Sequence, residues 1–129
     1  MILVEGQEDV LLYPSIAAQV ERSFGGEFFG WGVGGAHNMP KICSVLKDLG
    51  FEKVAGILDL DQQGEIGNLL SKFPKYFFAC IPAKDIRTKE TPVNGQQVVG
   101  LLDTNRQLDE QYRVPVIDLI DRINSYLNS

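Results

Sequence analysis

Two pairs of acidic residues each follow a short apolar run, and their types and spacing suit metal chemistry. The first pair is Asp59 and Asp61, and the second is Glu5 and Asp9. In an extended chain, a spacing of two places both side chains on the same face, as for Asp59 and Asp61. If the two apolar runs are neighbouring parallel strands, these carboxylates meet at one edge, where like charges need a counter-ion. Carboxylate ligands without histidine favour Mg²⁺, or Mn²⁺, over zinc.

Other residues near the ends of the expected strands suit phosphoryl chemistry. A hard cation at this edge would bind phosphate oxygens and polarise phosphorus, and a second cation would activate water. Gly34, Gly35 and Gly64 let the backbone turn tightly beside a phosphate. Lys84 follows the last expected strand and would neutralise charge in the transition state, while Glu5 has an alternative role as general acid or base. We therefore predict Glu5 and Lys84 as catalytic residues, and Gly34, Gly35, Gly64 and Lys84 as contacts to the substrate phosphate.

Hydrophobic periodicity predicts the elements that must position these residues. Strands are expected at residues 1–4, 27–33, 53–60 and 76–81. Helices are expected at about 9–24, between Asn38 and Gly50, at about 65–73 and at 115–128. This alternation predicts an α/β fold with three layers, α/β/α, around a central, mainly parallel four-stranded sheet of Rossmann-like type.

Several side-chain placements follow from the same patterns. Pro14 must lie in the first turn of its helix or kink it, since it has no N–H to donate. The second helix is expected to bury one apolar face, made of Ile42, Val45, Leu46 and Leu49. The aromatic residues of the second strand are expected in the core rather than against nucleobases: Phe28, Phe29 and Trp31.

The length of 129 residues predicts a single domain spanning 1–129. Its core is expected at about 1–85. A polar connection at 83–113, with one short helix, is expected to reach over the site. The closing helix, 115–128, is expected to begin at Pro115.

Composition limits the classes of function. The net charge of −5 argues against a chain that binds nucleic acid unaided, so a basic surface would come from another domain or subunit. No apolar stretch is long enough to span a membrane, and no signal pattern opens the chain. Cys43 and Cys80 are interpreted as buried reduced thiols, and we expect a cytoplasmic protein without membrane contact.

The order of these motifs resembles a known family, the Toprim domain. The resemblance rests on Glu5-Gly6 after the first strand, Gly34-Gly35 after the second, and the run from Asp59 to Gly64 after the third. Toprim domains are the catalytic modules of topoisomerases, bacterial primases and several nucleases. The Glu-Gly-x-x-Asp pattern at 5–9 and the helix ending Leu49-Gly50 are most similar to OLD-type nucleases, which carry the domain behind an ABC-type ATPase.

This resemblance implies phosphodiester hydrolysis in nucleic acid, with DNA ranked ahead of RNA, and a possible ATPase partner. Glu5, Asp9, Asp59 and Asp61 would be ligands of Mg²⁺ or Mn²⁺. A further acid is expected soon after the fourth strand, and Asp85 is available there. The sequence holds no ATP-binding loop, so the chain is expected to be a fragment or a free-standing member.

Two other classes of function stay open. The first is a non-catalytic module of the same fold that serves interaction or regulation, which the acidic surface favours. The second is a receiver-like or phosphatase-like domain, which also uses acid clusters and Mg²⁺. We rank it third because the first strand ends in Glu5, a poor match to a phospho-accepting aspartate.

Overall fold

A sheet of three parallel strands forms the centre of the fold, which we describe from a computed structural model covering residues 1–89, 95 and 97–129. The strands are β1 (Ile2–Leu3), β2 (Ala55–Leu58) and β3 (Phe77–Cys80), in the spatial order β1-β2-β3. Every residue of β2 is buried, as expected of the middle strand of a parallel sheet covered on both faces.

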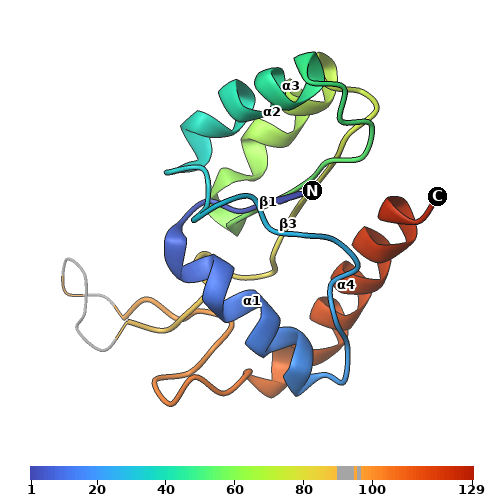
Figure 1. Ribbon diagram of the computed structural model, residues 1–129. Helices are drawn as coiled ribbons and strands as arrows, with labels where there is room; N and C mark the ends of the chain where they lie inside the picture. The colour runs from blue at the N-terminus through green and yellow to red at the C-terminus, as the bar shows by residue number, and fades with distance from the viewer. Residues whose placement is uncertain (90–94, 96) are drawn as a thin grey trace.

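Helices cover both faces of this sheet. α1 (Gln7–Gln19) and α4 (Arg113–Leu127) lie on one face, and α2 (Met39–Asp48) and α3 (Ile66–Lys72) lie on the other (Figure 1). Three short 3₁₀ helices complete the described elements: η1 (Ala36–Asn38), η2 (Leu60–Glu65) and η3 (Glu110–Tyr112). The predicted α/β class with a parallel sheet is therefore confirmed.

The alternation of side chains along each strand creates two separate core clusters. Ile2 and Ile57 point into the cluster under α1 and α4, whereas Leu3 and Leu58 point into the cluster under α2 and α3. The first cluster also contains apolar residues from the end of the chain, among them Leu101, Leu102, Val116, Leu119, Ile120 and Ile123.

The prediction of a strand at 27–33, which would have given the sheet four strands, is wrong for this structure. The segment does run beside β1, since the Ile2 N–H donates to the Glu27 carbonyl (2.7 Å) and the Phe29 N–H to the Ile2 carbonyl (2.9 Å). Only an isolated parallel bridge between Ile2 and Phe28 forms. The pairing is interrupted because Gly30 and Gly32 turn the chain, with φ of +47° and +87°.

Two predicted side-chain placements also need correction. α2 buries Met39, Cys43 and Leu46, so Val45 and Leu49 are exposed by 54% and 69%. Both sets of residues have helical spacing, and packing on the sheet selects the one that begins at Met39. Trp31 is 67% exposed rather than buried. Of the two alternatives predicted for Pro14, the first-turn position is excluded, because the residue lies inside α1 beyond its first turn.

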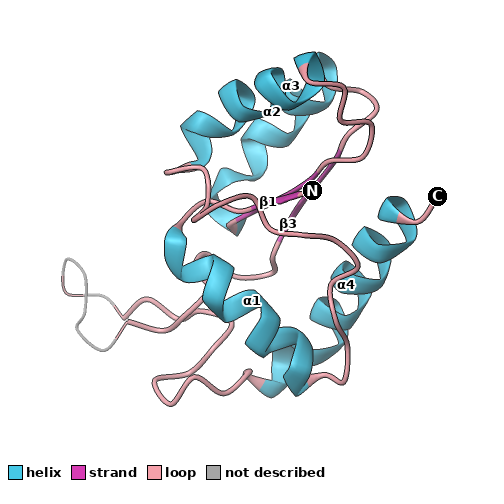
Figure 2. Cartoon of the chain, in the orientation of Figure 1, coloured by secondary structure: helices cyan, strands magenta, loops and turns pink. Residues whose placement is uncertain are grey.

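The connection after β3 is anchored to the rest of the fold by its apolar residues. Leu101 and Leu102 are fully buried, and Leu102 pairs with both Arg87 and Leu108. Gly100 passes against Arg87 so closely that a Cβ there would lie 2.3 Å from the Arg87 carbonyl carbon. Figure 2 shows the described part of this connection mainly as loop. Residues 90–94 and 96 of the predicted connection lie outside the described residues.

None of the helices in the described part of the chain combines the length and apolar character that a membrane span requires.

Candidate functional site

The carboxyl ends of β1 and β2 bring two of the predicted acids together. The strands pair in parallel, so Glu5 after β1 and Asp59 after β2 reach the same edge of the sheet. Glu5 Oε2 accepts a hydrogen bond of 2.6 Å from the Asp59 backbone N–H. The condition stated for a shared acidic edge, that the two apolar runs are neighbouring parallel strands, is met by β1 and β2.

The two predicted glycines hold the backbone of Glu5. The N–H groups of Gly34 and Gly35 both donate to the Glu5 carbonyl oxygen, at 3.0 and 2.8 Å. Their φ angles of +82° and +107° lie in the region that favours glycine, which explains the residue type at both positions. Because both N–H groups are used within the protein, their contact with a substrate phosphate stays a prediction.

Asp9 lies close by, in the first turn of α1, and is 9% exposed. Asp9 Oδ2 accepts a hydrogen bond of 3.1 Å from the Gly6 N–H, and therefore stabilises the start of the helix. Burial raises the pKa of Asp9 to about 6, and repulsion from Asp85 and Glu8 adds to this effect. The hydrogen bond from Gly6 and the positive charge of Lys89 act in the opposite direction.

A fifth acid joins the group from the segment after β3. The Leu60 N–H donates to the Ala83 carbonyl (3.0 Å), which brings this segment against the end of β2. Asp85 follows two residues later, and its Oδ2 lies 3.3 Å from the Lys89 ammonium. We call the five side chains together the acid edge: Glu5, Asp9, Asp59, Asp61 and Asp85.

The acid edge carries more negative charge than its surroundings neutralise. Burial raises the pKa of Asp59 to about 8, and repulsion from the other four acids adds to this shift. Burial likewise raises the pKa of Glu5, despite the opposing hydrogen bond from the Asp59 N–H. A positively charged ligand at this edge would relieve the repulsion.

A comparison with protein families matches the first part of the chain to a known domain. Residues 1–61 match a family model described as "Overcoming lysogenization defect protein-like, TOPRIM domain". The resemblance to the Toprim domain of OLD-type nucleases is confirmed. No curated protein and no solved structure matches the chain. The Toprim match includes β1, β2 and the acids from Glu5 to Asp61, whereas Asp85, β3 and α4 lie beyond it.

The acid edge of this Toprim-like region suits Mg²⁺ by its chemistry. Among the residues that the structure describes, no three Asp, Glu, His or Cys side chains already converge as a closed metal site. Mg²⁺ does not need such a site, since it usually keeps several waters and uses one or two protein carboxylates with substrate phosphates. Glu5 and Asp59 are neighbouring acids that could supply these one or two carboxylates. The all-oxygen donors and the unbalanced charge therefore fit a hard divalent cation.

The remaining predicted site residues are more exposed. Asp61 and Gly64 lie in η2, and Gly64 has open space around it and no positive φ, so nothing local requires glycine there. Lys84 is exposed next to Ala83, at the acid edge, and forms no ion pair within the described residues. These positions are compatible with contact to substrate, and their roles stay predictions.

Two residues of this region were not predicted from the sequence. Lys89 is the lysine paired with the acid edge; its spacing of four from Asp85 is a weak signal outside a helix. Gly32 packs on the residue after Glu5, because a Cβ at Gly32 would lie 2.7 Å from the Gly6 carbonyl carbon. Gly30, inside the predicted strand at 27–33, was the sequence feature that could have indicated a turn at this place.

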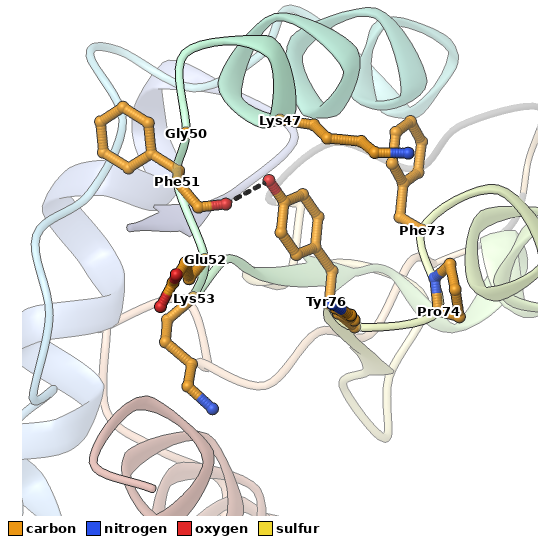
Figure 3. Close-up of a pocket in the computed structure, with 9 residues that line it drawn as sticks. Lys47, Gly50, Phe51, Glu52, Lys53, Phe73, Pro74 and Tyr76 are labelled. Atoms are coloured by element: carbon orange, nitrogen blue, oxygen red, sulfur yellow. Dashed lines mark hydrogen bonds between the residues drawn. The ribbon is translucent and has the colours of Figure 1, made fainter.

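A cavity of about 810 Å³ lies at the opposite edge of the sheet, where β2 and β3 begin. Figure 3 shows its aromatic lining, in which the Tyr76 hydroxyl donates to the Phe51 carbonyl oxygen (2.7 Å). Lysines 47, 53 and 75 also line it. The cavity is separated from the acid edge by the length of the strands, so it does not serve the same chemistry.

Proposed function

We propose that this chain carries out Mg²⁺-dependent hydrolysis of phosphodiester bonds in nucleic acid, with Mn²⁺ as an alternative ion. A Toprim domain indicates a metal-dependent function on nucleic acid. The observation that carries the more specific proposal is the hydrogen bond from the Asp59 N–H to Glu5, which joins the ends of two acid-tipped strands. The mutual repulsion within the acid edge supports the same conclusion.

The residues of the chain would divide the work as follows. Glu5, Asp59 and Asp61, with Asp9, would hold the cation, which supplies polarisation of the phosphate and activation of water. Gly34 and Gly35 hold the Glu5 carbonyl and thereby orient its carboxylate toward Asp59. With a pKa of about 8, Asp59 retains a proton near neutral pH until a positive charge offsets its neighbours.

Lys84 is the residue we propose for neutralising charge on the phosphate. It is exposed at the acid edge, whereas Lys89 is committed to Asp85. An exposed ammonium can approach a phosphate without first breaking an ion pair within the protein. Gly64, three residues after Asp61 in the same 3₁₀ helix, would line the approach of the substrate.

The substrate would bind with help from a second component. A net charge of −5 leaves the chain without the basic footprint of a nucleic-acid-binding protein. We propose that another domain or subunit supplies this surface, with an ATPase of the OLD type as a candidate, in a cytoplasmic setting. DNA ranks ahead of RNA as the substrate.

Calorimetric titration with Mg²⁺ and Mn²⁺ tests the proposal most directly. The unaltered chain is expected to bind in a saturable manner, and an Asp59→Asn/Asp61→Asn variant is expected to lose this binding. An Asp48→Asn/Glu52→Gln variant replaces the same number of carboxyl groups by amides at exposed residues elsewhere, and should bind like the unaltered chain. Equal binding by all three proteins would contradict a metal site at the acid edge.

A nuclease assay on single-stranded and duplex DNA and RNA then separates hydrolysis from binding. A second candidate function is a non-catalytic Toprim-fold module, favoured because no closed group of three ligands exists among the described residues. Saturable metal binding without cleavage, even in the presence of an ATPase partner, would support that candidate and contradict hydrolysis.

A further inference from the structure

Trp31 is exposed to solvent, which is unusual for a large aromatic side chain. Its side chain is 67% exposed, although Phe28 and Phe29 beside it are half-buried and pack on the two core clusters. No aromatic or cation contact to Trp31 is present in the part of the chain that the structure describes. A large aromatic face is therefore presented to solvent.

The turn that presents Trp31 is held firmly. The Gly32 N–H donates to the Phe29 carbonyl at 3.1 Å and closes the turn. Gly30 and Gly32 both adopt positive φ, and the next residue, Val33, is tied to the end of β1 through its N–H and the Val4 carbonyl (2.9 Å). A ligand that contacts Trp31 would order little additional backbone, which favours binding.

This turn lies beside the acid edge. Gly32, the next residue after Trp31, packs directly on Gly6, and Gly6 follows Glu5. Since consecutive Cα atoms are about 3.8 Å apart, the Trp31 Cα lies within roughly 9 Å of the Gly6 Cα. At about 3.4 Å per nucleotide, this distance corresponds to one to three nucleotides along a strand.

We propose that Trp31 stacks on an unpaired nucleobase of the substrate, one to three nucleotides from the phosphate at the acid edge. This inference rests on the proposed function, because it takes the acid edge as the site of the phosphate. Stacking uses an uncharged face and suits a chain of net charge −5, which cannot rely on basic side chains for affinity. The acid edge would contact a phosphate of the substrate. Trp31 would contact a different part of the same strand, an unpaired base.

The fluorescence of Trp31 gives a direct test, since it is the one tryptophan of the chain. The probe is a single-stranded oligonucleotide with methylphosphonate linkages, whose neutral backbone removes any need for metal or basic side chains. We expect saturable quenching by this strand and none by an abasic strand with the same backbone. Equal responses to the two strands, or no response to either, would overturn the proposal.

Variants separate stacking from general loss of structure. For a labelled base-bearing single strand, Trp31→Ala is expected to weaken binding about 10-fold by fluorescence anisotropy, and Trp31→Phe is expected to retain most of the affinity. Phe51→Ala removes a 40% exposed aromatic at the opposite edge of the sheet and should leave affinity unchanged. Circular dichroism checks that each variant is folded. Unchanged binding by Trp31→Ala would contradict stacking.

The proposed function and this inference fail in different ways. Asp59→Asn/Asp61→Asn should abolish cleavage and leave the quenching of Trp31 intact. Quenching without cleavage by the unaltered chain would contradict the proposed hydrolysis and leave stacking supported. Cleavage that Trp31→Ala leaves unchanged, with unchanged affinity, would contradict stacking alone.

Discussion

At the scale of single residues, Glu5 connects three parts of the chain. Its carboxylate accepts the Asp59 N–H, and its carbonyl accepts the N–H groups of Gly34 and Gly35. The position of each acid directly after an apolar run was enough to predict that Glu5 and Asp59 lie near each other, because the carboxyl ends of parallel strands meet at one edge of the sheet. The use of the glycine N–H groups was not predictable, since sequence alone does not say which acceptor a backbone donor meets.

The raised pKa of Asp59 leads to a prediction about stability. The folded state holds the Asp59 proton more tightly than the unfolded state, with a pKa of about 8 against an ordinary value of 3.8. This group therefore stabilises the metal-free protein below about pH 4, and that contribution is lost as the pH rises through about 8. Asp59→Asn should accordingly stabilise the metal-free protein at pH 9, by about 1 kcal/mol after allowance for solvent screening.

Urea unfolding in the presence of a chelator measures this effect. The difference between Asp59→Asn and the unaltered chain should be much smaller at pH 5 than at pH 9. Asp48→Asn, at an exposed position, should give little difference at either pH. A difference for Asp59→Asn that does not change with pH would contradict the account of the acid edge.

At the scale of elements, the glycine turn at 30–32 decides how the second predicted strand ends. The aromatic residues before it have strand character, and the segment does pair with β1 through single hydrogen bonds. Two glycines with positive φ then interrupt the pairing before it can extend into a regular strand. In α2, the apolar positions permitted two buried faces. The exposed Val45 and Leu49 are as apolar as the buried Met39 and Cys43, so local pattern could not choose between the faces.

The same turn gives a prediction about packing. Gly32→Ala should destabilise the protein by about 2–3 kcal/mol, because the new methyl group would meet the Gly6 backbone at 2.7 Å and φ is +87°. Gly64→Ala is the matched control, with open space and no positive φ, and should stay within about 0.5 kcal/mol. Chemical denaturation measures both variants. Similar values for the two would show that the contact between Gly32 and Gly6 contributes little.

At the scale of the whole molecule, the core extends beyond the part that matches the Toprim family. The match covers residues 1–61, but the cluster that contains Ile2 and Ala17 also contains Leu101 and Ile120. The closing helix was predictable from its apolar spacing, and Val116, Leu119, Ile120 and Ile123 of this helix are buried. Its contacts with β1 and α1 were not predictable, because they join distant parts of the sequence.

This shared core predicts that the described chain unfolds as one unit. Ile120→Ala, at a residue that is 1% exposed, should cost about 3 kcal/mol and should lower the stability of β1 and α4 together. Val114→Ala changes a 75% exposed residue of the same helix and should stay within about 0.5 kcal/mol. Hydrogen exchange of backbone amides, with urea unfolding, makes the measurement. Loss of protection in α4 alone would indicate that the helix is a separate unit.

The parallel pairing of β1 with β2 has a consequence for the rate of folding. Glu5 and Asp59, which join the ends of these strands, are 54 residues apart in the sequence. The chain must lose the entropy of closing that loop before β1 gains its partner, whereas β2 can pair with β3 over a shorter separation, so refolding is expected to be slower than that of a helical bundle of this size. Until then the apolar edge of β1 is open to other chains, and concentrated refolding mixtures should aggregate through it.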